Sequence, residues 1–138
     1  MMATQAPVEP EAKPDPGAKR CLIVDDSRVI RKISRRIAEN LGYIAVEAEN
    51  GAEALNRCEE QMPDLILLDW DMPVMTGIEF VEAFRDLEPV RKATVVFCTS
   101  KGEADSVEQA MGKGADAYVV KPFDQAALEE KLAKVTAN

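Results

Sequence analysis

The chain has 138 residues and a formal net charge of -8 at pH 7, with 25 acidic and 17 basic side chains. This length suits one modest domain, and the negative charge argues against a nucleic-acid-binding surface, so neither DNA nor RNA is an expected partner. The first 19 residues are rich in proline and contain no aromatic side chain. We therefore expect a disordered tail at 1–19 and a single folded domain at 20–137.

Membrane and secretion signals are missing from the sequence. No apolar run approaches the roughly 20 residues that cross a bilayer, and the amino end lacks the pattern of a signal peptide. The three cysteines, Cys21, Cys58 and Cys98, do not have metal-site spacing, so we expect reduced, buried thiols. The expected protein is cytoplasmic and monomeric and makes no contact with a membrane.

Strand and helix patterns alternate five times along the chain. Short apolar runs predict strands, and Ser27 is a suitable N-cap for a first helix that Gly42 ends. The apolar residues of that helix recur at helical spacing. They are Ile30, Ile33, Ile37 and Leu41, and the five strands are expected at 21–24, 44–48, 65–68, 94–98 and 117–120.

The later helices also have recognisable beginnings. Asn50 with Glu53, and Thr76 with Glu79, have the spacing of a capping box, which predicts helices that begin near Gly51 and Gly77. Two further helices are expected at about 103–113 and from residue 124 onward.

The fold class follows from this alternation. Strands that are apolar along their whole length suit a parallel sheet covered by helices on both faces. We predict a single-domain α/β fold, a doubly wound (βα)5 sheet with the flavodoxin-like strand order 2-1-3-4-5. This order places the first and third strands side by side.

A polar residue follows four of the predicted strands at the point where each strand ends. Asp25 and Asp26 follow the first strand, Asp69 the third, Thr99 the fourth and Lys121 the fifth. Because the carboxyl ends of parallel strands meet at one edge of the sheet, these side chains are expected to share one crevice.

The chemistry of that crevice is acidic and oxygen-rich. Three carboxylates repel one another unless a cation joins them, and the chain contains no histidine, so a hard ion such as Mg2+ is the expected cofactor. Asp69 stands alone and suits a nucleophile that attacks phosphorus, whereas the adjacent Asp25 and Asp26 suit metal binding. Lys121 and Thr99 could contact the equatorial oxygens of the phosphoryl group.

With these residues in place, the chain resembles the response-regulator receiver family, most closely its single-domain, CheY-like members. The resemblance spans residues 20 to 137 and rests on four motifs in this order. They are Val24–Ser27, Leu68–Gly77, Cys98–Ser100 and Val120–Phe123.

The resemblance implies a signalling phosphoacceptor of a two-component system or phosphorelay, and not an enzyme with its own substrate. Asp69 would accept a phosphoryl group from a histidine kinase or a histidine phosphotransfer protein. Asp25, Asp26, Asp69 and the backbone carbonyl of Asp71 would surround Mg2+.

The resemblance also assigns a switch. Thr99 would move toward the phosphoryl oxygen, Lys121 would pair with it, and Tyr118 would change between exposed and buried rotamers. The face formed by the helix at 103–113, the last strand and the last helix would then bind partners. Receivers usually carry a cis peptide at the position of Lys121–Pro122.

Two features of this chain bear on rates and partners. Asp71 lies where active members often have asparagine, and we hypothesise that it pairs with Lys101 and slows loss of the phosphoryl group, although two independent solvated side chains are an equal alternative. The first helix is strongly basic in an acidic protein, which predicts a surface that steers an acidic phosphodonor. Its basic residues are Arg28, Arg31, Lys32, Arg35 and Arg36, against the single acid Glu39.

Two other functions remain open at this point. Asp69-Trp70-Asp71 also matches the Asp-x-Asp opening of haloacid-dehalogenase phosphatases, although in this chain the acidic pair precedes the nucleophile. Within the receiver family, the protein could be a phosphate sink or relay intermediate that returns phosphate to a histidine protein, instead of an effector.

Overall fold

A computed structural model describes residues 18–70, 75–87, 93–100, 111 and 115–136. These residues contain a five-stranded sheet of order β2-β1-β3-β4-β5, and every strand pair in it is parallel. The predicted flavodoxin-like order is therefore confirmed. The elements are β1 (Arg20–Val24), α2 (Arg28–Asn40), β2 (Ile44–Ala48), α3 (Gly51–Glu60), β3 (Leu65–Asp69), α4 (Gly77–Leu87), β4 (Thr94–Thr99), β5 (Ala117–Val120) and α6 (Gln125–Thr136).

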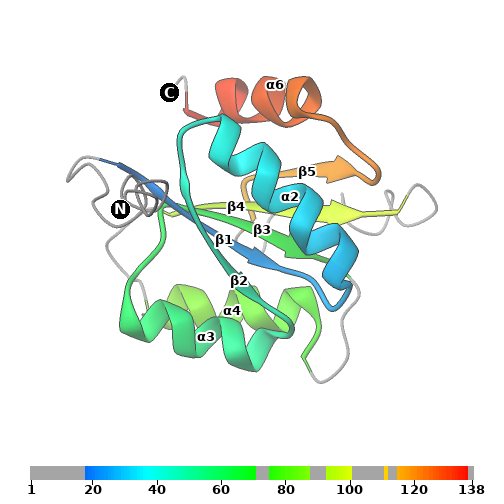
Figure 1. Ribbon diagram of the computed structural model, residues 1–138. Helices are drawn as coiled ribbons and strands as arrows, with labels where there is room; N and C mark the ends of the chain where they lie inside the picture. Colours follow the sequence, from blue (N-terminus) through cyan, green and yellow to red (C-terminus); the bar gives the residue numbers. More distant parts are fainter. Residues whose placement is uncertain (1–17, 71–74, 88–92, 101–110, 112–114, 137–138) are drawn as a thin grey trace, which may run out of the picture.

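Helices cover both faces of the sheet. In Figure 1, α2 and α6 lie on one face, and α3 and α4 lie on the other. Alternate strand residues enter the two apolar layers, so that Leu22 and Val24 pack with α3 and α4, whereas Cys21 and Ile23 pack with α2 and α6. The central strand β3 is buried along its whole length. Burial on both faces explains why this strand is apolar up to Asp69.

Helices α2, α3 and α4 begin at the N-cap residues that the sequence predicted. The side chains of Ser27, Asn50 and Thr76 each accept a hydrogen bond from the backbone N–H three residues later, at 3.3, 2.8 and 3.2 Å. Gly42, just beyond α2, has a φ of 97°, a conformation that favours glycine. The helix expected at 103–113 falls almost entirely outside the described residues, as does most of the tail expected at 1–19.

One helix differs from the apolar pattern in the sequence. In α2 the buried residues are Ser34, Ile37 and Ala38, whereas Ile33 is 48% exposed and Val29 is 66% exposed. The helix is therefore rotated so that two adjacent apolar side chains, one turn apart, face outward. This rotation leaves an apolar patch on a helix that is otherwise basic.

Candidate functional site

The predicted site residues come from neighbouring strands at one edge of the sheet. Val24 pairs with Leu68, so the residues at the ends of β1 and β3, Asp25 and Asp69, lie side by side. On the other side of β3, Asp69 pairs with Cys98, the residue before Thr99. The parallel topology thus brings the predicted carboxylates and the hydroxyl to the same end of adjacent strands.

Asp25 is held firmly by its surroundings and is only 3% exposed. Its backbone N–H donates a hydrogen bond to the Ala48 carbonyl at 3.1 Å, and its Oδ1 accepts one from the Ser27 N–H at 2.9 Å. Asp26, by contrast, is exposed. The pair therefore consists of one buried, fixed carboxylate and one at the surface.

Lys121 joins the two buried carboxylates. Its Nζ donates to Asp69 Oδ1 at 3.1 Å and to Asp25 Oδ2 at 3.4 Å. The backbone N–H of Lys121 donates to the Thr99 carbonyl at 2.7 Å, which holds the end of β5 against β4. The Lys121–Pro122 peptide is cis, as the resemblance implied.

These contacts perturb the charges of the site. The pKa of Asp69 is raised to about 6, first by burial and then by the negative charge of Asp25, although the hydrogen bond and positive charge of Lys121 act in the opposite direction. Burial lowers the pKa of Lys121, but the hydrogen bond and negative charge of Asp69 outweigh that effect, so its pKa lies above the usual value. Asp69 is thus ionised at neutral pH yet more basic than an ordinary aspartate.

The carboxylates have an arrangement that suits a divalent ion. One oxygen from each of Asp25, Asp26 and Asp69 lies within 4.8 Å of the others. All the donors are oxygens, and two of the three residues are buried. Burial, followed by the charge of Asp25, raises the pKa of Asp69, so a cation would relieve an unfavourable concentration of carboxylates, and the residues fit Mg2+. Asp71, whose carbonyl was predicted to complete the site, lies outside the described residues, as does Lys101.

The predicted switch residues occupy β4 and β5. Thr99 is fully buried, and its Oγ1 donates to the Ser100 carbonyl at 3.3 Å. Tyr118 is partly buried and pairs in register with Phe97, and Lys131 of α6 lies 5.1 Å from its ring centroid. Trp70, next to Asp69, packs edge-on against Phe97 with a centroid distance of 5.1 Å. Aromatic residues in or directly after three neighbouring strands, Trp70, Phe97 and Tyr118, therefore belong to one packed cluster.

The basic surface of α2 contains an acidic partner that sequence reasoning missed. Glu47 of β2 accepts from Arg31 Nε at 3.0 Å and Arg35 Nη1 at 2.8 Å, and it lies 3.8 Å from Lys32. These bonds outweigh the effect of burial and lower the pKa of Glu47. Glu47 lies two residues after Ala45, which packs under α2, so strand alternation could have placed its side chain on the α2 face.

Arg31 also reaches the acidic site itself. Its Nη1 donates to the backbone carbonyl of Asp25 at 2.8 Å, and its side chain is only 16% exposed. Of the basic residues predicted to form a docking surface, Arg28 and Lys32 are exposed, whereas Arg31 is committed to contacts within the domain.

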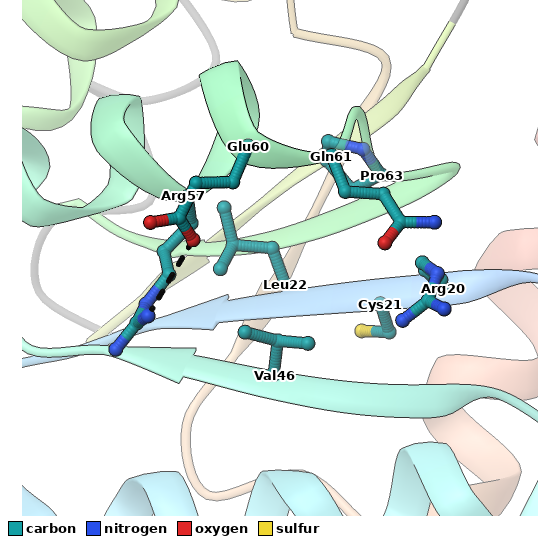
Figure 2. A pocket seen from close by; sticks show the side chains of 8 residues that line it. All are labelled: Arg20, Cys21, Leu22, Val46, Arg57, Glu60, Gln61 and Pro63. Atoms are coloured by element: carbon teal, nitrogen blue, oxygen red, sulfur yellow. Dashed lines mark ion pairs between the residues drawn. The ribbon is translucent and has the colours of Figure 1, made fainter.

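A cavity of about 160 Å3 lies elsewhere, between the beginning of β1 and the end of α3 (Figure 2). Leu22 and Val46 form its apolar floor, and Arg20 and Arg57 lie toward its two ends. Arg57 pairs with Glu60, and the N–O distance is 3.7 Å. This cavity is at the amino ends of the strands, opposite the acidic site, and no predicted site residue lines it.

Comparison with known proteins identifies the class to which this fold and site belong. The family model of the response regulator receiver domain matches residues 21–133. The chain belongs to the receiver family of two-component signalling. This membership decides against the haloacid-dehalogenase phosphatase interpretation.

Individual relatives agree with this assignment. The chemotaxis protein CheY of Halobacterium salinarum is 37% identical over 118 residues, which are 86% of this chain and 97% of that protein. The phosphate regulon transcriptional regulatory protein PhoB of Escherichia coli is 37% identical over 120 residues, 87% of this chain but only 51% of PhoB. The structure of Vibrio cholerae CheY4 matches with a TM-score of 0.78 and 32% identity, covering 86% of this chain and 99% of that one.

The helices were also compared with the requirements of a membrane span. Within the described ranges, no helix combines the length and the apolar character that a bilayer span requires.

Proposed function

We propose that this receiver domain accepts a phosphoryl group on Asp69 from a histidine kinase or a histidine phosphotransfer protein, with Mg2+ as cofactor. The observation that carries this proposal is the contact of Lys121 Nζ with Asp69 Oδ1 at 3.1 Å, beside carboxylates whose oxygens lie within 4.8 Å of one another. One side chain can then act as nucleophile while a fixed ammonium faces the incoming phosphoryl group.

The transfer forms one bond and breaks another. An ionised Oδ of Asp69 attacks phosphorus, the P–N bond to the donor histidine breaks, and its electron pair returns to the imidazole. The pKa of about 6 favours this step, because Asp69 is ionised at neutral pH but more basic than an ordinary aspartate. Lys121 neutralises a phosphoryl oxygen. When bound by Asp25, Asp26 and Asp69, Mg2+ would neutralise further negative charge.

The proposed output is a change of the β5 and α6 surface. Thr99 is buried at the end of β4, and its hydroxyl donates to the Ser100 carbonyl at 3.3 Å. In the proposed switch, this hydroxyl turns toward a phosphoryl oxygen on Asp69. Movement of Thr99 would leave space that the ring of Tyr118 could enter. Because Lys131 of α6 lies over that ring, this movement would alter the surface that partners contact.

The proposed docking surface for the phosphodonor is the outer face of α2. Val29 and Ile33 are exposed there, in a stripe beside the exposed basic residues Arg28 and Lys32. An apolar stripe with a basic stripe beside it suits a partner that presents apolar side chains next to acidic ones.

The experiment is phosphorylation by acetyl phosphate, a small donor that needs no docking surface. Intact-mass analysis should show addition of one phosphoryl group to the wild-type protein in the presence of Mg2+ and none to Asp69→Asn. Incorporation in Asp69→Asn at the wild-type level would exclude Asp69 as the acceptor. Reverse transfer to a histidine protein would favour a sink or relay role, whereas phosphorylation-dependent binding to another target would favour an effector.

A further inference from the structure

The backbone of Asp25 is fixed from the adjacent strand β2 by two routes. In the direct route, its N–H donates to the Ala48 carbonyl at 3.1 Å. In the indirect route, its carbonyl accepts from Arg31 Nη1 at 2.8 Å, and Nε of the same guanidinium donates to Glu47 Oε1 at 3.0 Å. Consecutive residues of β2 therefore hold both peptide groups of Asp25.

Burial makes the indirect route effective. The side chains of Arg31 and Glu47 are each 16% exposed, so their ion pair is partly shielded from water and salt. A guanidinium is a planar fork of donors, and here one nitrogen binds the acid while another binds the carbonyl. A lysine has a single nitrogen, which could not reproduce both bonds with this geometry.

We infer that Arg31 is a positioning residue, held by Glu47, that fixes the β1–α2 connection so that the Asp25 carboxylate is ready for the metal before the metal arrives. The inference rests on the proposed function, because it assumes that this site binds Mg2+. Arg31 therefore has a different role from Arg28 and Lys32, whose exposed side chains suit partner docking. Partners that orient a metal ligand in this way commonly contribute about tenfold to metal affinity.

Electrostatics alone predicts that loss of Arg31 changes the Mg2+ affinity in the opposite direction. Removing a positive charge close to the acidic site should strengthen the binding of a cation. Loss of positioning should weaken it. The direction of the change therefore distinguishes the two effects without reference to phosphorylation.

The chain offers a matched control in Arg35. This residue lies one turn further along α2, carries the same charge and binds the same acid, with Arg35 Nη1 2.8 Å from Glu47 Oε2, but no bond between Arg35 and Asp25 is found in the described part of the chain. Arg31→Ala and Arg35→Ala thus remove the same charge and one ion pair with Glu47. Only Arg31→Ala removes the bond to the Asp25 carbonyl.

The experiment measures Mg2+ affinity through Trp70 fluorescence and, in metal-free protein, amide hydrogen exchange at residues 25–27. Arg31→Ala and Arg31→Lys should both bind Mg2+ about tenfold more weakly and exchange faster at these amides. Arg35→Ala should keep the wild-type affinity, or bind slightly more tightly, with unchanged exchange.

The outcomes are distinct. Unchanged or tighter Mg2+ binding by Arg31→Ala would overturn the inference, as would equal weakening in Arg35→Ala. If Arg31→Ala does not fold, the same measurements on Arg31→Lys test the inference. Wild-type Mg2+ affinity and wild-type amide exchange in Arg31→Lys would overturn it, because lysine cannot bind Glu47 and the Asp25 carbonyl with two separate nitrogens. Failure of the wild-type protein itself to bind Mg2+ would contradict the proposed function instead.

Discussion

Asp69→Asn is expected to stabilise the metal-free protein at neutral pH, although it removes the proposed acceptor. Asp69 is 6% exposed, and its pKa rises from 3.8 to about 6 on folding, with burial as the largest cause and Asp25 as the next. The folded state therefore disfavours the ionised form. Asparagine is nearly isosteric with the protonated acid, and its amide oxygen can still accept from Lys121.

The magnitude follows from the shift in pKa. About two units correspond to about 3 kcal/mol at a pH above both values, and since the folded value is the higher one, this is a cost to the wild-type protein. Below about pH 4, Asp69 is protonated in both states and the cost disappears. It grows as the pH rises from about 4 to about 6 and is constant above that range.

Urea denaturation with EDTA, followed by circular dichroism from pH 3.5 to 8, measures this difference. The variant should be more stable by up to about 3 kcal/mol at pH 7.5, with the advantage vanishing near pH 4. Mg2+ should reduce the advantage, since an ion that binds the native wild-type protein stabilises it. A variant that is less stable at pH 7.5, or a difference independent of pH, would refute the reasoning.

Three further predictions concern docking and stability. Joint Arg28→Glu and Lys32→Glu substitution should slow phosphotransfer from a histidine protein about tenfold at low salt, with no effect on labelling by acetyl phosphate. Lys134 is an exposed lysine in the last turn of α6, and the control variant Lys134→Glu should leave both rates unchanged. Equal slowing with acetyl phosphate would contradict a docking role. Asn50→Ala, which removes the α3 cap, should lower the free energy of unfolding by about 1 kcal/mol in urea. Phe84 of α4 is fully buried in the core, so Phe84→Ala should lower the free energy of unfolding by about 3–5 kcal/mol in the same assay. A loss below about 1 kcal/mol would show that the surrounding side chains close the cavity.

The position of the site could be predicted because the strand ends follow from local patterns and the strand order follows from the few topologies open to a parallel sheet. An apolar run followed by a polar residue marks a strand end, and parallel topology then brings Asp25, Asp69 and Lys121 together. The same reasoning does not reveal that Lys121 Nζ bridges both acids, since that depends on rotamers and on distances between strands.

The surface of α2 could not be predicted to the same extent. Helical periodicity identified an apolar stripe, but it did not show that Ile33 is nearly half exposed, because the rotation of a helix depends on the layer beneath it. Charge counting along the helix also missed Glu47, which comes from a neighbouring strand. The apparent excess of positive charge on α2 is therefore smaller in the folded protein than in the sequence.

The most direct test of the central claim is Trp70 fluorescence during titration with Mg2+ and then with beryllofluoride, which mimics an aspartyl phosphate. Trp70 follows Asp69 and packs against Phe97, so it should report events at the acceptor. Wild-type protein should give a saturable Mg2+ response and a further beryllofluoride response that Asp69→Asn abolishes. Folded wild-type protein that responds to neither, or a beryllofluoride response that persists in Asp69→Asn, would contradict the assignment of Asp69 as the phosphoacceptor.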